Sequence, residues 1–230
     1  MMRMFTDAHP TQTNIATFYD QMTGEAYDDF LVRINYVDPY NITEAIYAEA
    51  PADGSPAGYG FLNTARDASI LDVGQGTGIM GKLLKAQGFN DIQGADASTK
   101  FNEVGRATGA YKECREVWFG RGVDQLPRDF LMRFDVVMGS GIFMDGHIPA
   151  AGFDDVHAMC KTGGHFITSM RKVYYQDGHE YGYKEKLDSL VRSGKFEWVK
   201  DWTFKRGVAG AEDPLFVEMD SFMYILKRLD

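Results

Sequence analysis

Hydrophobic residues recur with a helical period in the first part of the chain. The segment 13–34 places apolar side chains three or four positions apart, and this spacing predicts a helix with one buried face. A second helix is predicted over 41–50, with Asn41 as its N-terminal cap. The following loop, 51–60, is rich in Pro and Gly. We interpret it as a connection within one domain because it is short and central.

After residue 68 the pattern changes to short apolar segments that alternate with helical ones. Strands are predicted over 69–74, 91–98, 114–119, 134–140 and 164–171, and helices over 79–88, 99–110 and about 148–161. Ser98 is the predicted cap of the helix that follows the second strand. Short apolar strands separated by helices favour a parallel sheet with helices on both faces.

The C-terminal part departs from this alternation. A helix is predicted over 183–194, and two strand segments, 196–205 and 221–229, follow without a helix between them. Two successive strands of this kind pair as an antiparallel hairpin. We therefore expect the sheet to end in an antiparallel hairpin at one edge.

Length and composition favour one domain over residues 1–230, with a flexible segment over about 1–12. The formal net charge of −9 repels phosphate backbones, so nucleic acid is not an expected partner. No window is apolar enough to span a membrane and the N-terminus has no apolar signal core, so we expect a cytoplasmic protein without membrane contact. His157 and His165 have no partners at ligand spacing, and no metal site is predicted.

Three alternating glycines, Gly74, Gly76 and Gly78, connect the first predicted strand to the helix after it. A glycine can adopt a positive φ and lets a ligand lie against the backbone, because it has no Cβ atom. Free N–H groups at a helix start favour an anion or a carboxylate, and ligands of doubly wound sheets bind beyond the carboxyl ends of the strands. A tight turn without a ligand would explain one glycine better than three.

The spacing of these glycines distinguishes two classes of nucleotide. The dinucleotide fingerprint G-x-G-x-x-G requires a third glycine where the chain has Ile79, and this argues against a nicotinamide oxidoreductase. Asp96 ends the second strand, and a carboxylate there can accept hydrogen bonds from both hydroxyls of a ribose. Asp96 therefore indicates a nucleoside, and an aspartate that only caps the loop is the alternative.

The chain instead reads D-x-G-x-G-x-G from Asp72 to Gly78, which resembles motif I of the class I S-adenosylmethionine-dependent methyltransferases. From about residue 14 to 228 it also resembles the methyltransferase-like family of the Williams–Beuren syndrome region. The stretches that carry this resemblance include FYDQMTGEAYDDF, GFNDIQGADAS, FDVVMGSGIFMDGHIP, KTGGHFITSMR, KLDSLVRSGKFEWV and FMYILKR. It implies a Rossmann-like α/β fold with a seven-stranded, mostly parallel sheet in the order 3-2-1-4-5-7-6, in which strand 7 is antiparallel and helices cover both faces.

The resemblance also implies S-adenosylmethionine as the cofactor, S-adenosylhomocysteine as the product, and helices from 13–50 over the cofactor site. By resemblance, the glycine loop holds the methionine end of the cofactor, Asp72 orients its amino group and Asp96 binds its ribose. Trp118 and Phe119 stand where the family places an acid for adenine, and the indole packs either against adenine or in the core. The implied cofactor residues are Tyr19, Tyr27, Asp72, Gly74, Gly76, Gly78, Asp96, Ala97, Trp118, Phe119 and Gly139.

Methyl transfer is an in-line displacement that holds the nucleophile about 3 Å from the methyl group and excludes water. The acceptor is expected over the end of the fourth strand, where His147 is the candidate catalytic base because its reference pKa lies near neutrality. Capping of the helix near Pro149 is the alternative role of His147. Phe143, Met144 and Tyr174 are candidates to line an aromatic acceptor site, with core packing as their alternative.

These observations predict a methyltransferase that uses S-adenosylmethionine on a small-molecule acceptor. A non-catalytic scaffold or regulatory protein that binds S-adenosylmethionine is the alternative. The Asn/Asp-Pro-Pro-Tyr/Phe tetrad that amino-directed DNA methyltransferases carry is absent from the sequence. Together with the acidic net charge, this argues against bases in DNA as acceptors.

Overall fold

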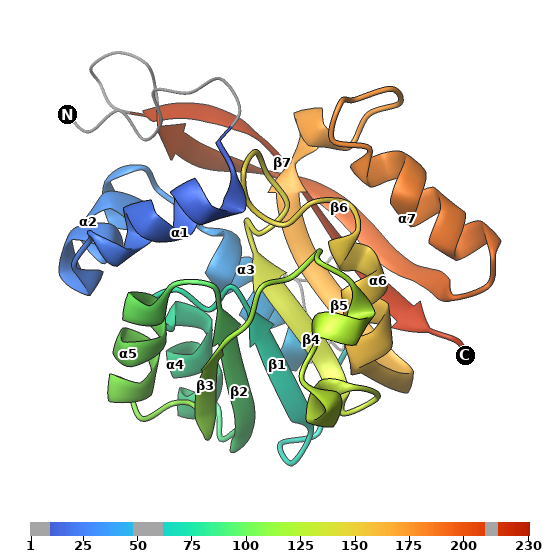
Figure 1. Ribbon diagram of the computed structural model, residues 1–230, viewed down its shortest axis with the longest axis horizontal. Coiled ribbons are helices and arrows are strands. Elements are labelled where there is room, and N and C mark those ends of the chain that lie inside the picture. Colours follow the sequence, from blue (N-terminus) through green and yellow to red (C-terminus); the bar gives the residue numbers. More distant parts are fainter. Residues whose placement is uncertain (1–9, 48–61, 210–215) are drawn as a thin grey trace, which may run out of the picture.

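The computed structural model describes residues 10–47, 62–209 and 216–230 (Figure 1). The predicted loop at 51–60 and residues 1–9 of the predicted flexible segment lie outside these ranges, as does the end of the helix predicted over 41–50. The described residues form a central sheet with helices on both sides.

A seven-stranded sheet forms the centre of the molecule (Figure 1). Its strands are β1 (Ser69–Val73), β2 (Asp91–Asp96), β3 (Glu113–Glu116), β4 (Phe134–Ser140), β5 (Cys160–Arg171), β6 (Phe196–Ala209) and β7 (Phe216–Arg228). Their order is β3-β2-β1-β4-β5-β7-β6. The first five pair in parallel, whereas β7 runs antiparallel to both β5 and β6. The predicted order and the antiparallel last strand are confirmed.

Helices cover both faces of the sheet. They are α1 (Gln12–Asp20), α2 (Gly24–Arg33), α3 (Asp38–Tyr47), α4 (Ile79–Ala86), α5 (Thr99–Ala107), α6 (Gly152–Met159) and α7 (Tyr183–Arg192), with 3-10 turns at Val123–Gln125, Arg128–Phe130 and Lys172–Tyr174. Ile70 of β1 belongs to a core with α3 and α4, and Leu71 belongs to a core with α6 and α7. Successive strand residues point to opposite faces, so β1 is buried from both sides.

The first predicted helix is divided into α1 and α2. Thr11 caps α1, and its hydroxyl accepts a hydrogen bond from the Asn14 amide at 3.2 Å. Thr23 caps α2 in the same way, with the Ala26 amide at 3.2 Å. A threonine cap favours a new helix start, and the apolar spacing alone does not show this break because both helices continue it.

The next helix begins earlier than predicted. α3 starts at Asp38, and Asn41 lies within it. Pro39 suits the first helical turn because its φ is preset and it has no N–H group. Asp38 is fully buried, and it accepts a hydrogen bond from the Arg206 guanidinium of β6 at 2.6 Å. This pair ties the N-terminal helices to the terminal hairpin.

The helix after β4 is shorter than predicted and the strand after it is longer. α6 ends at Met159 and β5 begins at Cys160. The Arg228 guanidinium donates to the carbonyl groups of His157 and Cys160, at 2.8 Å and 2.6 Å. These bonds satisfy carbonyl groups that the end of α6 leaves unpaired. Because Arg228 is distant in sequence, the local pattern could not reveal this boundary.

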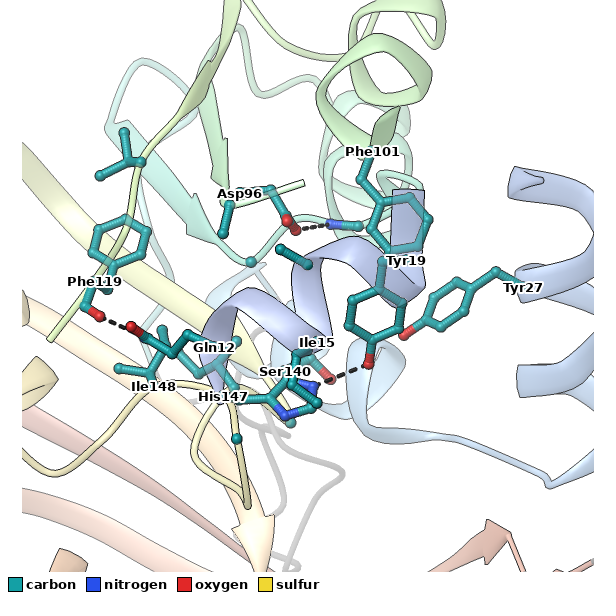
Figure 2. A pocket seen from close by; sticks show the side chains of 18 residues that line it. Gln12, Ile15, Tyr19, Tyr27, Asp96, Phe101, Phe119, Ser140, His147 and Ile148 are labelled. Carbon is teal, nitrogen blue, oxygen red and sulfur yellow. Dashed lines mark hydrogen bonds between the residues drawn. The ribbon is translucent and has the colours of Figure 1, made fainter. Parts of the chain in front are cut away.

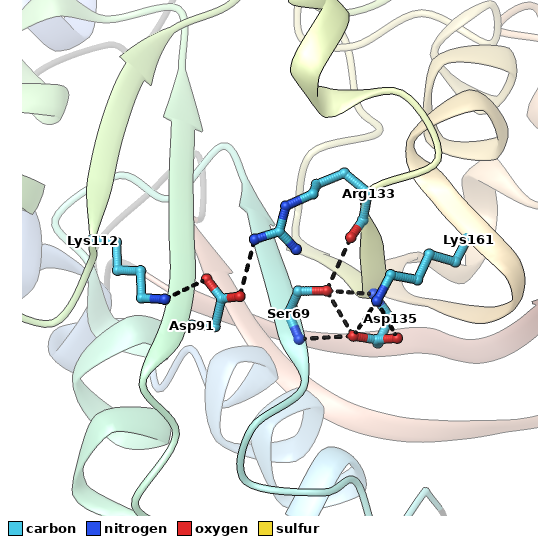
Figure 3. A network of polar contacts seen from close by, with 6 residues as sticks. All are labelled: Ser69, Asp91, Lys112, Arg133, Asp135 and Lys161. Atoms are coloured by element: carbon cyan, nitrogen blue, oxygen red, sulfur yellow. Dashed lines mark hydrogen bonds and ion pairs between the residues drawn. The ribbon is translucent and has the colours of Figure 1, made fainter.

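A polar network joins the amino ends of the parallel strands (Figure 3). Asp91 at the start of β2 pairs with Arg133 at 3.0 Å, and Asp135 of β4 accepts a bond from the Ser69 amide of β1 at 2.9 Å. Lys161 pairs with Asp135 at 2.8 Å. The network therefore holds the strands together at the edge formed by their amino ends. It does not involve the opposite edge, where the carboxyl ends of the strands lie.

Candidate functional site

A cavity of about 110 Å³ lies at the carboxyl ends of the parallel strands (Figure 2). Gly74 and Gly76 reach it from the end of β1, and Asp96 from the end of β2. α1 and α2 cover it with side chains that include Tyr19 and Tyr27. This is the edge at which doubly wound sheets bind their ligands.

The glycine loop forms one side of the cavity. Gly74, Gly76 and Gly78 have φ of 65°, 53° and 83°, the left-handed region in which other residues are strained. A Cβ atom on Gly74 would lie 2.8 Å from Ile142, whereas one on Gly76 would lie 3.8 Å from the nearest side chain, that of Tyr27. Gly74 and Gly76 line the cavity and Gly78 does not. Gly76 is therefore the glycine over which a ligand has room against the backbone.

Asp96 lies at the cavity with both of its carboxylate oxygens held by backbone amides. Oδ2 accepts from the Gly76 amide at 3.1 Å and Oδ1 accepts from the Ser98 amide at 2.8 Å. Burial raises the pKa of Asp96 to about 6, against the lowering effect of these two bonds. A carboxylate has about four lone-pair sites, so Asp96 retains capacity to accept from a ligand hydroxyl. Ala97 also lines the cavity.

Asp72 does not line the cavity. It is fully buried in β1, and the Tyr111 hydroxyl donates to its Oδ2 at 2.7 Å. Its Oδ1 has no hydrogen-bond partner, and burial raises the pKa of Asp72 to about 8. Tyr111 also accepts a bond from the Gly81 amide at 3.2 Å. The pair therefore supports the start of α4 from beneath.

Tyr111 is a residue to which sequence reasoning gave no role. A Cβ atom on Gly81 would overlap the Tyr111 ring, so Gly81 is what admits this ring against α4. A glycine inside a predicted helix is the signal that marks such a close approach.

His147 and Tyr19 meet at the cavity (Figure 2). The Tyr19 hydroxyl lies 3.0 Å from Nε2 of His147, and Nδ1 lies 2.9 Å from the Asp145 carbonyl oxygen. A carbonyl oxygen only accepts, so Nδ1 carries the proton and Nε2 accepts from Tyr19. Burial lowers the pKa of His147 and raises that of Tyr19. Both groups are neutral at neutral pH, and His147 presents a basic nitrogen to the cavity.

Aromatic rings form the wall between the glycine loop and α1. The ring centroid of Phe101 lies 5.1 Å from those of Tyr19 and Tyr27, which are 5.7 Å apart. Phe101 was not among the predicted site residues. It lies in the first turn of α5, and its amide donates to the Ser98 hydroxyl at 3.0 Å. The capped helix directly after Asp96 was the feature of the sequence that could have indicated a site residue at this position. The three rings shield the cavity from water.

The segment after β3 places only one of its two predicted residues in the cavity. Phe119 lines it. Trp118 does not, because its indole N–H donates to Glu116 at 3.2 Å and the Arg121 guanidinium lies 4.0 Å from its ring centroid. Gly139 also lies outside the lining, since Ile142 occupies the space beside it.

None of the three residues predicted to line the acceptor site lies along the cavity. Phe143 is buried in the core, with its ring stacked on Phe153 at 4.2 Å. The Met144 carbonyl accepts from the Tyr183 hydroxyl at 3.3 Å. Tyr174 bonds Arg171 at 3.2 Å. Phe143 therefore packs in the core, as the alternative interpretation of this residue expected. The loop after β4 turns its side chain toward α6.

No group of three or more His, Cys, Asp and Glu residues among the described residues could hold a metal ion. None of the helices in this part of the chain is long and apolar enough to cross a membrane.

Comparisons with known proteins agree with this geometry. No protein-family model matches the chain. The chain is 26% identical over 189 residues to methyltransferase-like protein 27 of Homo sapiens. The aligned region covers 82% of this chain and 71% of that protein. The structure of the present chain is similar to that of a TehB-like S-adenosylmethionine-dependent methyltransferase from Corynebacterium glutamicum, with a TM-score of 0.54 and 18% sequence identity. The match covers 89% of this chain and 97% of that chain.

A further structural neighbour bears on the acceptor. The chain resembles a proposed RNA methyltransferase from Pyrococcus horikoshii with a TM-score of 0.52, 12% identity and coverage of 71% and 76% of the two chains. At these identities the likeness shows the fold. The expectation that nucleic acid is not a partner therefore finds no support in the comparisons, because one neighbour of the same fold is described as acting on RNA.

Proposed function

The chain is a class I S-adenosylmethionine-dependent methyltransferase, and we propose that it methylates a small molecule whose nucleophile gives its proton to His147. The resemblance seen in the sequence is confirmed at the level of this class, and S-adenosylmethionine is the cofactor. The nature of the acceptor and the roles of individual residues are our proposals.

The residues at the cavity fit the cofactor that we assign to it. Gly76 lines the cavity without a side chain, and the carboxylate of Asp96 can accept a hydrogen bond from a ribose hydroxyl. Tyr19, Tyr27 and Phe101 keep water out. When bound, S-adenosylmethionine supplies a methyl carbon that is activated by a positively charged sulfur. Asp72 is beneath the loop, so we assign it to the support of the loop through Tyr111.

The neutral imidazole of His147 is the observation that carries the proposed chemistry. Its Nε2 accepts from the Tyr19 hydroxyl, and its Nδ1 is fixed by the Asp145 carbonyl. An acceptor O–H or N–H in place of the Tyr19 hydroxyl would donate to the same lone pair. The base would then take the proton as the nucleophile attacks, which is the step that a protonated nucleophile requires. A base held in this way favours an enzyme over a non-catalytic scaffold.

A small acceptor is supported by the way the cavity is enclosed. α1 and α2 lie over it, and apolar residues such as Ile15, Ile142 and Ile148 contribute to its lining. Small-molecule sites are lined mainly by apolar side chains with a few polar groups among them. The net charge of −9 also works against a polyanionic acceptor.

The test is release of S-adenosylhomocysteine with a panel of small phenols, amines, thiols and carboxylates, and with RNA. We expect turnover with a member of the small-molecule panel, lowered about 100-fold or more by His147→Ala. His179→Ala is the matched control, because His179 packs on Tyr174 and Tyr181 away from the cavity. Turnover with RNA alone, or full turnover by His147→Ala, would contradict the proposal.

A further inference from the structure

One end of the cavity lies beyond strand β3. Val117 and Phe119 follow β3 and line this end together with Ile148. β3 neighbours β2, which carries Asp96. A nucleoside whose sugar bonded Asp96 would place its base toward Val117 and Phe119, whose apolar side chains suit a flat ring. Figure 2 shows Gln12 beside Phe119 and Ile148, on the other side of the cavity from Tyr27.

We propose that Gln12 recognises the amino-bearing edge of the adenine ring, an inference that rests on the proposed function of this cavity. The neighbouring lining residues Val117, Ile15 and Ile148 are apolar, and the Gln12 side chain bonds the Phe119 carbonyl directly. The acid nearest in sequence, Glu116, accepts bonds from Thr99 at 2.9 Å and from the Trp118 indole, and it does not line the cavity.

The carboxamide of Gln12 is held in one orientation. Its Nε2 donates to the Phe119 carbonyl oxygen at 2.8 Å, and the Arg121 Nε lies 3.4 Å from its Oε1. A carbonyl oxygen cannot donate and a guanidinium cannot accept, so a flipped amide would lose both partners. One N–H of Nε2 and one lone pair of Oε1 remain available.

These two free positions match adenine. The amino group of adenine donates and the adjacent ring nitrogen accepts, and glutamine recognises this pair with two hydrogen bonds. Hypoxanthine carries an oxygen in place of the amino group and presents the opposite pattern. Since the bonds to Phe119 and Arg121 prevent a flip of Gln12, the site is predicted to discriminate between the two bases.

Calorimetric titration of S-adenosylhomocysteine and of its deaminated analogue, S-inosylhomocysteine, tests this inference. We expect the wild-type chain to prefer the adenine compound about tenfold or more. Gln12→Met keeps the length and the helix propensity of the side chain but removes its hydrogen bonds, so the preference is expected to fall below about threefold, mainly through weaker adenine binding. Circular dichroism confirms that each variant is folded.

Thr11→Ala is the matched control. It removes the cap of α1 while Gln12 stays intact, so it loosens the helix without changing the recognising group. The preference for adenine is expected to survive in this variant. An unchanged preference in Gln12→Met, or an equal loss in Thr11→Ala, would overturn the inference. Failure of wild-type protein to bind S-adenosylhomocysteine at all would instead overturn the proposed function on which it rests.

Discussion

The Tyr19 hydroxyl lies 3.0 Å from Nε2 of His147 and joins α1 to the loop after β4 across the cavity. The Asp145 carbonyl holds the other ring nitrogen and so fixes the tautomer, and burial lowers the pKa of His147 and favours the neutral imidazole. A residue of the covering helices thus contacts the side chain that we propose as the base.

Replacing Tyr19 by Phe is expected to raise the pKa of His147. The hydroxyl donates to the neutral imidazole and stabilises that form, so its loss makes protonation easier. An NMR titration of the His147 ring checks this. Tyr27→Phe is the control, because its ring packs on Tyr19 but the bond to His147 is kept. Equal pKa values in wild type and Tyr19→Phe would argue against the donor role of Tyr19.

The pH dependence of methyl transfer is the second prediction. In the proposed chemistry His147 is a base only when it is neutral, and burial lowers its pKa below the usual value of about 6.5. Activity is therefore retained at neutral pH and lost as the pH falls through this lowered pKa. The acid limb of kcat/KM is expected below 6.5, and it should move to higher pH in Tyr19→Phe. A limb that does not respond to this variant belongs to another group.

Gly76→Ala and Gly109→Ala form a matched pair. Both residues have positive φ, 53° and 67°, so each substitution should cost about 1 kcal/mol or more of stability. A Cβ on Gly109 meets nothing within 4 Å, whereas one on Gly76 points between Tyr27 and Phe101 at the cavity. Calorimetry should show that S-adenosylhomocysteine binds at least about tenfold more weakly to Gly76→Ala than to wild type, and that Gly109→Ala binds it as wild type does. Similar losses in both variants would mean that strain, not space, explains the glycine.

Gly81→Ala tests the support beneath the loop. The new Cβ overlaps the Tyr111 ring, and such overpacking is expected to destabilise the chain by about 1–3 kcal/mol. In a Tyr111→Ala background the same change should be neutral or stabilising, since Ala favours a helix over Gly by about 0.5–1 kcal/mol. Urea unfolding of the four proteins gives the coupling energy. Additive effects would show that the ring and the glycine do not interact.

The alternation of strands and helices predicted a parallel sheet with a terminal hairpin, and the family resemblance supplied the strand order that the structure confirms. Gly74, Gly76 and Asp96 could be placed because they lie at or just after the carboxyl ends of β1 and β2, and parallel strands end at one edge. The helices were harder to predict. The break at Thr23 depends on a cap within a continuous apolar pattern, and the end of α6 depends on Arg228, which is far away in sequence.

The acceptor side was the least predictable part. Phe143 follows β4 as a lining residue would, yet the turn of the loop buries its ring against Phe153. Gln12 lies before the first predicted helix, and its approach to Phe119 spans a large part of the chain. Contacts of this kind depend on how α1 packs over the sheet. The local spacing of apolar residues in the sequence does not predict them.

Binding of S-adenosylhomocysteine to wild type, Asp96→Ala and Glu116→Ala tests the central claim most directly. Glu116 is an exposed acid on the neighbouring strand β3 and does not line the cavity, so it controls for the loss of one negative charge. We predict that isothermal titration calorimetry shows binding to wild type and to Glu116→Ala, and binding about 10- to 100-fold weaker in Asp96→Ala because two charge-assisted hydrogen bonds are lost. Equal affinities of wild type and Asp96→Ala, or no binding by wild type, would contradict the account.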